Sequence, residues 1–227
     1  MKRIEQAETS PSALAMYKEF AREFTASSKT LYPCAGIDVT PSQVFIDVTY
    51  LELNEARANI LKKSRKHVLN LDIRSLPVSG YDLLIIQNPE IPTEWMTPHL
   101  LPNGLIIANN HHGNAKWLYE RSKRSKEFDF IAGLEVICNP GNSFTAKLER
   151  DTSGYFQPVK DEKELNSLPE ARKRTILEDI ESALRIKGNE VPSGNFMQDL
   201  RRAQTLLKKD FSMPAKRTAN SYIFRKN

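Results

Sequence analysis

Two acidic side chains lie in apolar segments that we expect to be neighbouring strands of one sheet. Asp47 lies at the end of the segment 44–48, and Asp72 ends the segment 68–72. A carboxylate at a strand end can accept hydrogen bonds from both hydroxyls of a ribose, or from an exocyclic amine. Asp47 could instead cap a helix, and Asp72 could simply pair with Arg74. A nucleoside site built on these two residues requires that both carboxylates converge at one edge of the sheet.

A turn with several small residues follows the first apolar segment. Small side chains would let a ligand approach the backbone closely. Thr40-Pro41 is typical of a helix start, where exposed backbone N–H groups suit an anionic group such as a carboxylate. The turn could equally be structural. Its candidate ligand-binding residues are Tyr32, Pro33, Cys34, Ala35, Gly36 and Asp38.

Two adjacent histidines, His111 and His112, follow the apolar segment 104–108. Neighbouring positions lack the spacing that chelation of one metal ion needs, and we predict no metal site. One imidazole could act as a base, because histidine titrates near neutral pH. A plain exposed loop is the favoured interpretation.

Apolar segments and amphipathic helices alternate around these residues. Near-continuous β-branched segments are typical of strands buried on both faces of a parallel sheet, and the helices between them indicate crossover connections. A turn signal at 139–142 predicts a β-hairpin, and 221–224 is either a short strand or a disordered end. The predicted strands are 30–33, 44–48, 68–72, 81–86, 104–108, 128–138 and 143–148, and the predicted helices are 12–26, 51–63, 114–126, 168–187 and 195–210.

The first crossover is short. Only seven residues, Ile37–Gln43, separate the first turn from the second predicted strand. A parallel crossover normally takes about a dozen residues. Either the first helix is cut to about one turn, or the second strand is misplaced.

Composition indicates a globular protein of 227 residues with a sizeable core, 40% hydrophobic and 27% charged. The predicted organisation is an N-terminal helix in 1–29, a sheet domain in 30–150 and a helical basic segment in 151–227. We expect a cytoplasmic location, because there is no run of eighteen apolar residues for a membrane span and no apolar leader. Two cysteines, Cys34 and Cys138, fit a reducing compartment.

The net charge of +5 is unevenly placed. Residues 160–227 hold 15 Lys and Arg against 10 Asp and Glu, whereas residues 1–159 hold 18 of each. Nucleic acid is therefore one conceivable partner of the C-terminal segment. A solvated helical face is favoured, because acidic residues are interleaved and almost no aromatic residues are present to stack on bases.

The order of these features resembles the class I S-adenosylmethionine-dependent methyltransferases over about residues 30–150. The similarity is carried by Asp47 with the helix behind it, Leu71–Ile73, Tyr81–Pro89 and Leu100–Ile107. It implies a Rossmann-like α/β fold: a mostly parallel methyltransferase sheet with an antiparallel C-terminal hairpin, followed by a helical C-terminal segment. It also implies S-adenosylmethionine as the cofactor.

The resemblance also implies roles for single residues. Asn88-Pro89 lies where amino-group methyltransferases orient an amine lone pair, so both are candidate catalytic residues; Glu90 replaces a second proline there. The glycine-rich loop of the family is reduced to Gly36. The implied cofactor-binding residues are Tyr32, Pro33, Cys34, Ala35, Gly36, Asp38, Asp47, Val48, Asp72 and Ile73.

We therefore expect methyl transfer to a small molecule or an amine. The alternative is a non-catalytic relative that uses the fold as a binding or interaction module. A nicotinamide-dependent oxidoreductase is less favoured, because the G-x-G-x-x-G turn is absent.

Overall fold

The structure, a computed structural model, describes residues 6–24, 29–64, 66–188, 191–207 and 214–227. It divides into two compact units. The first comprises Met1–Thr152 and Ala219–Asn227, and the second comprises Ser153–Thr218. The last nine residues, which we assigned from the sequence to the C-terminal segment, thus belong to the unit that contains the sheet.

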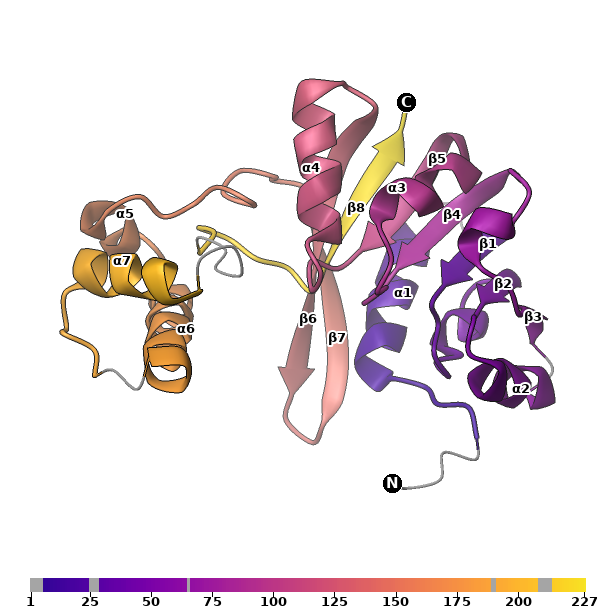
Figure 1. The fold of residues 1–227 in the computed structure, drawn as a ribbon, viewed down its shortest axis with the longest axis horizontal. Helices are drawn as coiled ribbons and strands as arrows, with labels where there is room; N and C mark the ends of the chain where they lie inside the picture. Colours follow the sequence, from indigo (N-terminus) through magenta and orange to yellow (C-terminus); the bar gives the residue numbers. More distant parts are fainter. Residues whose placement is uncertain (1–5, 25–28, 65, 189–190, 208–213) are drawn as a thin grey trace. The chain divides into compact units, whose positions relative to one another are not determined.

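An eight-stranded sheet organises the first unit (Figure 1). Its strand order is β3-β2-β1-β4-β5-β8-β6-β7, and the first five strands in this order are parallel. The order reverses between β1 and β4, which makes that point the topological switch of a doubly wound sheet. The predicted Rossmann-like fold class is confirmed. The parallel strands are β1 (Lys29–Pro33), β2 (Asp47–Leu51), β3 (His67–Leu69), β4 (Tyr81–Ile86) and β5 (Leu100–Ala108).

The other end of the sheet is antiparallel. The predicted hairpin forms from β6 (Phe128–Asn139) and β7 (Ser143–Glu149), with Gly141 and Asn142 at positive φ in the turn. The C-terminal strand β8 (Ser221–Lys226) inserts between β5 and β6 and runs antiparallel to both. The tail is therefore an interior strand of the sheet.

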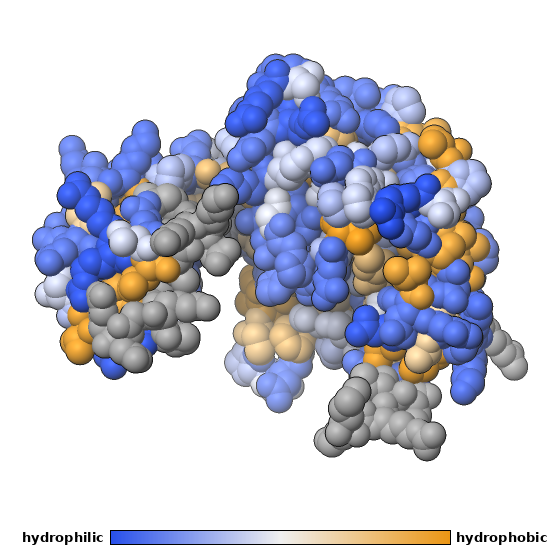
Figure 2. All heavy atoms as spheres, in the orientation of Figure 1, coloured by the Kyte–Doolittle hydropathy of each residue, from blue (hydrophilic) through white to orange (hydrophobic). Residues whose placement is uncertain are grey.

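Two helices cover opposite faces of this antiparallel end. α1 (Pro11–Glu23), capped by Ser10, packs on β6 and β7, whereas α4 (Asn114–Arg124) packs on β6 and β8. Neighbouring side chains of β8 point to opposite faces. Ile223 joins the core beside α1, and Phe224 stacks on Phe130 towards α4. Figure 2 shows the mostly hydrophilic outer surface of this region.

The remaining short helices of the first unit lie in the connections between its parallel strands. α2 (Glu55–Lys63) begins after the capping residue Asn54 and connects β2 to β3. α3 (Thr93–Met96) follows β4. Single turns of 3-10 helix lie at Thr40–Gln43, Ile73–Ser75 and Thr97–His99.

The predicted second strand was misplaced. β2 begins at Asp47, so the first crossover has the thirteen residues 34–46 and contains only one 3-10 turn. Phe45 is buried, but it packs its ring against Tyr17 and Phe20 of α1 instead of lying in the sheet. The apolar residue Phe45 of the segment 44–46 thus serves a contact with α1. Its neighbour Ile46 is fully exposed.

The second unit is helical. It contains α5 (Glu162–Asn166), α6 (Glu170–Gly188) and α7 (Phe196–Leu207), with α6 and α7 close to the predicted helices; residues 208–210 of the second prediction lie outside the described residues. Its own core includes Ile176, Leu184 and Leu200. In the part of the chain that the structure describes, no helix has the length and apolar character of a membrane span.

Replacement of Phe224 by alanine tests whether β8 is an interior strand of the sheet that contributes to stability. The ring is fully buried, so Phe224→Ala should lower the free energy of unfolding by about 3–5 kcal/mol through lost burial and a cavity. The matched control is Ile46→Ala, which removes a fully exposed side chain and should change stability by less than about 0.5 kcal/mol. Urea denaturation measures both, and equal effects would contradict the interior position of β8.

Candidate functional site

The carboxyl ends of the five parallel strands bring together a set of polar residues. Parallel strands end at the same edge of a sheet, and ligands bind there near the topological switch. Cys34 directly follows β1, Glu52 directly follows β2, Asn88 lies two residues beyond β4 and Asn109 directly follows β5. These residues define a candidate ligand site on both sides of the switch point.

Glu52 is the most buried of them. Its side chain is buried, and its two oxygens accept separate backbone hydrogen bonds: Oε2 from the Gly36 N–H at 2.9 Å and Oε1 from the Asn54 N–H at 2.8 Å. The carboxylate thus ties the turn after β1 to the start of α2. Since a carboxylate has about four lone-pair sites, it can still accept two further donors. It lines a cavity of about 510 Å³ together with Cys34, Leu53, Asn54, Arg57, Asn88, Glu90 and Ile91.

The expected convergence of Asp47 and Asp72 is wrong. Asp47 begins β2 instead of ending it, is exposed, and pairs in register with Lys29 at the amino end of β1. It therefore lies at the opposite edge from the residues after Leu51. Glu52 occupies the strand-end position that we had assigned to Asp47. The sequence signal for it is an acid two residues before the helix-capping residue Asn54.

Asp72 has the structural role that the sequence left open. Its carboxylate caps the 3-10 turn at Ile73–Ser75 and pairs with the Arg74 guanidinium, with Oδ2 at 2.6 Å from Nη2. Hydrogen bonds from Arg74 hold the pKa of this half-buried carboxyl down at about 2. Arg74 in turn lies over the Trp95 ring at 4.8 Å. Asp72 does not line the cavity at Glu52.

Hydrogen bonds to Asp38 fix the conformation of the turn after β1. Asp38 accepts from the Tyr32 hydroxyl at 3.1 Å and from the Thr40 N–H and hydroxyl, so its carboxylate organises the turn. Gly36 has φ +62° and no heavy atom within 4 Å of the position where a Cβ would stand. Its left-handed conformation favours glycine, and the open space would accept a ligand.

A second cavity, of about 390 Å³, lies between this turn and α1. It shares Cys34 and Asn88 with the cavity at Glu52, so the two flank the switch point. The Tyr17 hydroxyl is fully buried and has no hydrogen-bond partner among the described residues. The other lining residues are Ser10, Ala13, Met16, Tyr17, Tyr32, Ala35, Gly36, Asp38 and Gln87.

Burial determines the protonation of several groups here. Burial, with the charges of Asp38 and nearby tyrosines, raises the pKa values of Tyr17 and Tyr32 well above 10.0, so both hydroxyls stay protonated donors. Burial, followed by the negative charge of Glu52, raises the pKa of the Cys34 thiol to about 11. Cys34 is therefore a neutral thiol near neutral pH, unsuited to act as a nucleophile.

Three further predicted cofactor-binding residues are buried. Pro33 ends β1, Val48 packs in the core of the sheet, and Ile73 begins the 3-10 turn after β3. None of their side chains lines either cavity.

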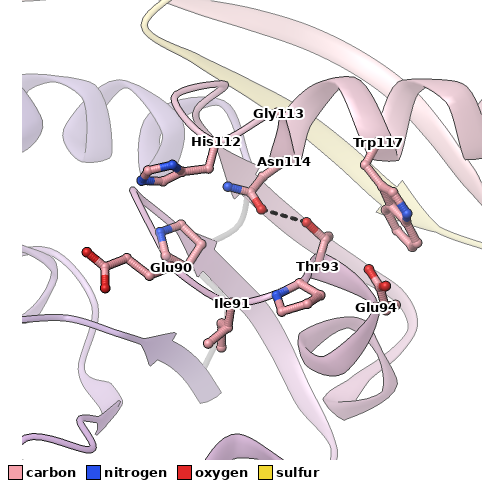
Figure 3. Close-up of a pocket in the computed structure, with 10 residues that line it drawn as sticks. Glu90, Ile91, Thr93, Glu94, His112, Gly113, Asn114 and Trp117 are labelled. Atoms are coloured by element: carbon pink, nitrogen blue, oxygen red, sulfur yellow. Dashed lines mark hydrogen bonds between the residues drawn. The ribbon is translucent and has the colours of Figure 1, made fainter. Parts of the chain in front are cut away.

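Asn88 and Asn109 form a reciprocal pair across the ends of β4 and β5. The Asn109 amide nitrogen donates to Asn88 Oδ1, and the Asn88 N–H donates to Asn109 Oδ1 at 3.2 Å. Asn88 has φ +52°, which asparagine tolerates better than most residues. The sequence analysis missed Asn109, because its role depends on the β4–β5 register. Pro89 is buried and lines a third cavity beyond the loop (Figure 3).

The two histidines lie in the loop that leads into α4. Their rings touch edge to face at 4.6 Å, and His112 lines the third cavity. The described residues contain no group of three side chains suited to hold a metal ion.

Fold and site together define a Rossmann-like α/β protein with a candidate ligand site at the carboxyl edge of its sheet. No family model and no curated protein matches the sequence. The structure is similar to a possible histamine N-methyltransferase from Thermotoga maritima, described as S-adenosylmethionine-dependent, with 12% identity over 60% of this chain and 83% of that one and a TM-score of 0.45.

Two further solved structures are similar at comparable levels. A Thermoplasma acidophilum protein has 13% identity, covers 66% of this chain and 93% of its own, and gives a TM-score of 0.43. An S-adenosylmethionine-bound amino pentose methyltransferase from Micromonospora echinaspora has 17% identity, 44% and 50% coverage and a TM-score of 0.36. The fold assignment itself rests on the strand order of the sheet.

Alkylation of the two cysteines tests the electrostatics of the site. A thiol of pKa about 11 has about a hundredfold less thiolate at about pH 8 than one at the usual 9.0. Cys34 should therefore react with iodoacetamide much more slowly than the exposed Cys138, and its rate should rise until about pH 11. Peptide mass spectrometry measures both rates.

A variant of Glu52 adds a control to this measurement. Glu52→Gln removes the negative charge that, after burial, most raises the pKa of the Cys34 thiol, so it should speed alkylation of Cys34. Glu55→Gln, at an exposed position of α2, should not. A Cys34 rate that matches Cys138, or that reaches a plateau well below pH 10, would refute the neutral thiol.

Proposed function

We propose that the chain is an S-adenosylmethionine-dependent methyltransferase that holds the adenosine part of its cofactor in the cavity at Glu52. The observation that carries the proposal is the buried carboxylate at the end of β2, which two backbone N–H groups fix in place. Two lone-pair sites remain, which matches the two neighbouring hydroxyls of a ribose. Leu53, which is two-thirds exposed beside this cavity, offers an apolar surface to a purine ring.

The second cavity suits the amino acid part of the same cofactor. The open backbone at Gly36 allows close approach, and the buried Tyr17 hydroxyl has a proton to donate and no acceptor within the described chain. A carboxylate would supply that acceptor and would satisfy a polar group whose burial is otherwise costly. The residues present therefore fit S-adenosylmethionine.

The cofactor supplies a methyl group on a positively charged sulfur, which is already an electrophile. The chain therefore needs only to bind, to orient the acceptor and to exclude water. Asn88 lies at the junction of the two cavities, where one lone pair of its Oδ1 is still unused by Asn109. Its role is to orient an acceptor, such as the nitrogen of a small-molecule amine, and Pro89 fixes the backbone that follows.

The hydrogen bond that the Asn88 side chain already accepts from Asn109 also favours a second function. A non-catalytic relative would bind the cofactor and transfer no methyl group. Formation of S-adenosylhomocysteine over a panel of amines and small molecules separates the two: binding without turnover on any of them supports the binding module.

Cofactor binding depends on Glu52 in this proposal, and Asp47 provides the matched control. Glu52→Gln removes the charge of the acceptor for ribose hydroxyls, and such hydrogen bonds contribute about 1.5–3 kcal/mol. The dissociation constant for S-adenosylhomocysteine should rise about ten- to a hundredfold by titration calorimetry. Asp47→Asn, at the opposite edge, should leave it unchanged. Absence of binding by the unaltered chain, or equal effects of the two variants, would contradict the proposal.

A further inference from the structure

A third cavity, of about 570 Å³, lies beyond the loop after β4 and is assigned no role in the proposed methyl transfer. One wall is the segment from Pro89 to Glu94, which leads into α3, and the other is formed by His112 and the first residues of α4 (Figure 3). Its size is typical of small-molecule sites. It meets the cavity at Glu52 only through the shared residues Glu90 and Ile91.

Asn114 gives this cavity a built polar feature. The residue is 3% exposed, its Oδ1 accepts from the Thr93 hydroxyl at 2.7 Å, and its Nδ2 has no partner among the described residues. In Figure 3 the amide nitrogen points away from Thr93, towards the side of the cavity where His112 lies. Leaving a buried amide donor unpaired is costly, so a ligand oxygen at this point would be stabilising.

Exchanging the two amide atoms does not remove the unpaired group. If Nδ2 faced Thr93, Oδ1 would face the cavity without a donor. A hydroxyl group satisfies either arrangement, since it both donates and accepts. The Asn114 side chain therefore selects for a ligand hydroxyl.

The charge of the cavity selects for a cation. Two carboxylates, Glu90 and Glu94, line it, and no lysine or arginine is among its lining residues. Neither carboxylate has an ion-pair partner within the described part of the chain. Figure 3 shows them near opposite ends of the segment that forms one wall. A protonated amine would meet uncompensated negative charge there.

We propose that this cavity binds a protonated amine that carries a hydroxyl group, that is, an amino alcohol. The ammonium group pairs with Glu90 or Glu94, and a hydroxyl pairs with Asn114. The site needs no cofactor and so does not depend on the proposed function.

The test is an NMR titration of the full chain with 1-amino-1-deoxysorbitol, and the control ligand is sorbitol, which differs only by a hydroxyl in place of the ammonium group. The amino compound should give saturable amide shifts in 90–94 and 113–117 at concentrations on the order of 10 mM or below. Sorbitol should give at most weak shifts. Equal responses to the two compounds, or no saturation in these segments, overturns the proposal.

Variants of exposed side chains keep the test free of folding defects. The double variant Glu90→Gln with Glu94→Gln should weaken binding of the amino compound about tenfold or more, whereas Glu55→Gln on α2 should not. Unchanged binding by the double variant overturns the proposal. Titration of the unaltered chain with S-adenosylhomocysteine keeps the two proposals apart: absence of that binding, with binding of the amino compound retained, counts only against the methyltransferase.

Discussion

The functional account depends on one carboxylate that joins two backbone segments. Glu52 accepts the Gly36 N–H from the turn after β1 and the Asn54 N–H from the start of α2, so it fixes the geometry of the edge where the strands end. A carboxylate in this position is stabilised by the two donors and keeps the capacity for two more. Burial, followed by the negative charge of Glu52, raises the pKa of the neighbouring Cys34 thiol and keeps it protonated. Polar capacity at this edge is therefore available for hydroxyl groups, and nucleophilic chemistry by the thiol is disfavoured.

The hydrophobic pattern of the sequence predicted a parallel strand correctly where the apolar residues are buried because they lie in the sheet. Nearly every residue of Tyr81–Ile86 is buried in its place in the sheet, and the predicted bounds are those of β4. The segment 44–46 is different, because Phe45 is buried by Tyr17 and Phe20 of α1, about twenty-five residues away. That long-range contact made a connection look like a strand, displaced β2 by three residues and directed attention to Asp47 instead of Glu52. The site prediction thus failed at the position on which it depended, although the edge it pointed to contains a suitable acid.

Other features could not be predicted because they depend on pairings between distant segments. β8 has an apolar pattern that fits a strand, but nothing in it shows that it enters the sheet between β5 and β6 after an insertion of 66 residues that forms a compact unit of its own. Asn109 gains its role only from the β4–β5 register that places it beside Asn88. The Oδ1 of Asn114 accepts from Thr93, while its Nδ2 has no partner among the described residues. Register and side-chain pairing of this kind are set by the assembled fold.

The most direct test of the central claim couples Glu52 to the ribose itself. The dissociation constants of S-adenosylhomocysteine and its 2′,3′-dideoxyribose analogue would be measured for the unaltered chain and for Glu52→Gln, as a double-mutant cycle. We predict that the unaltered chain loses about tenfold or more in affinity when the two hydroxyls are removed, and that the variant loses much less, because it has already lost the charged partner of those hydroxyls. The same loss in both proteins would show that Glu52 does not hold the ribose.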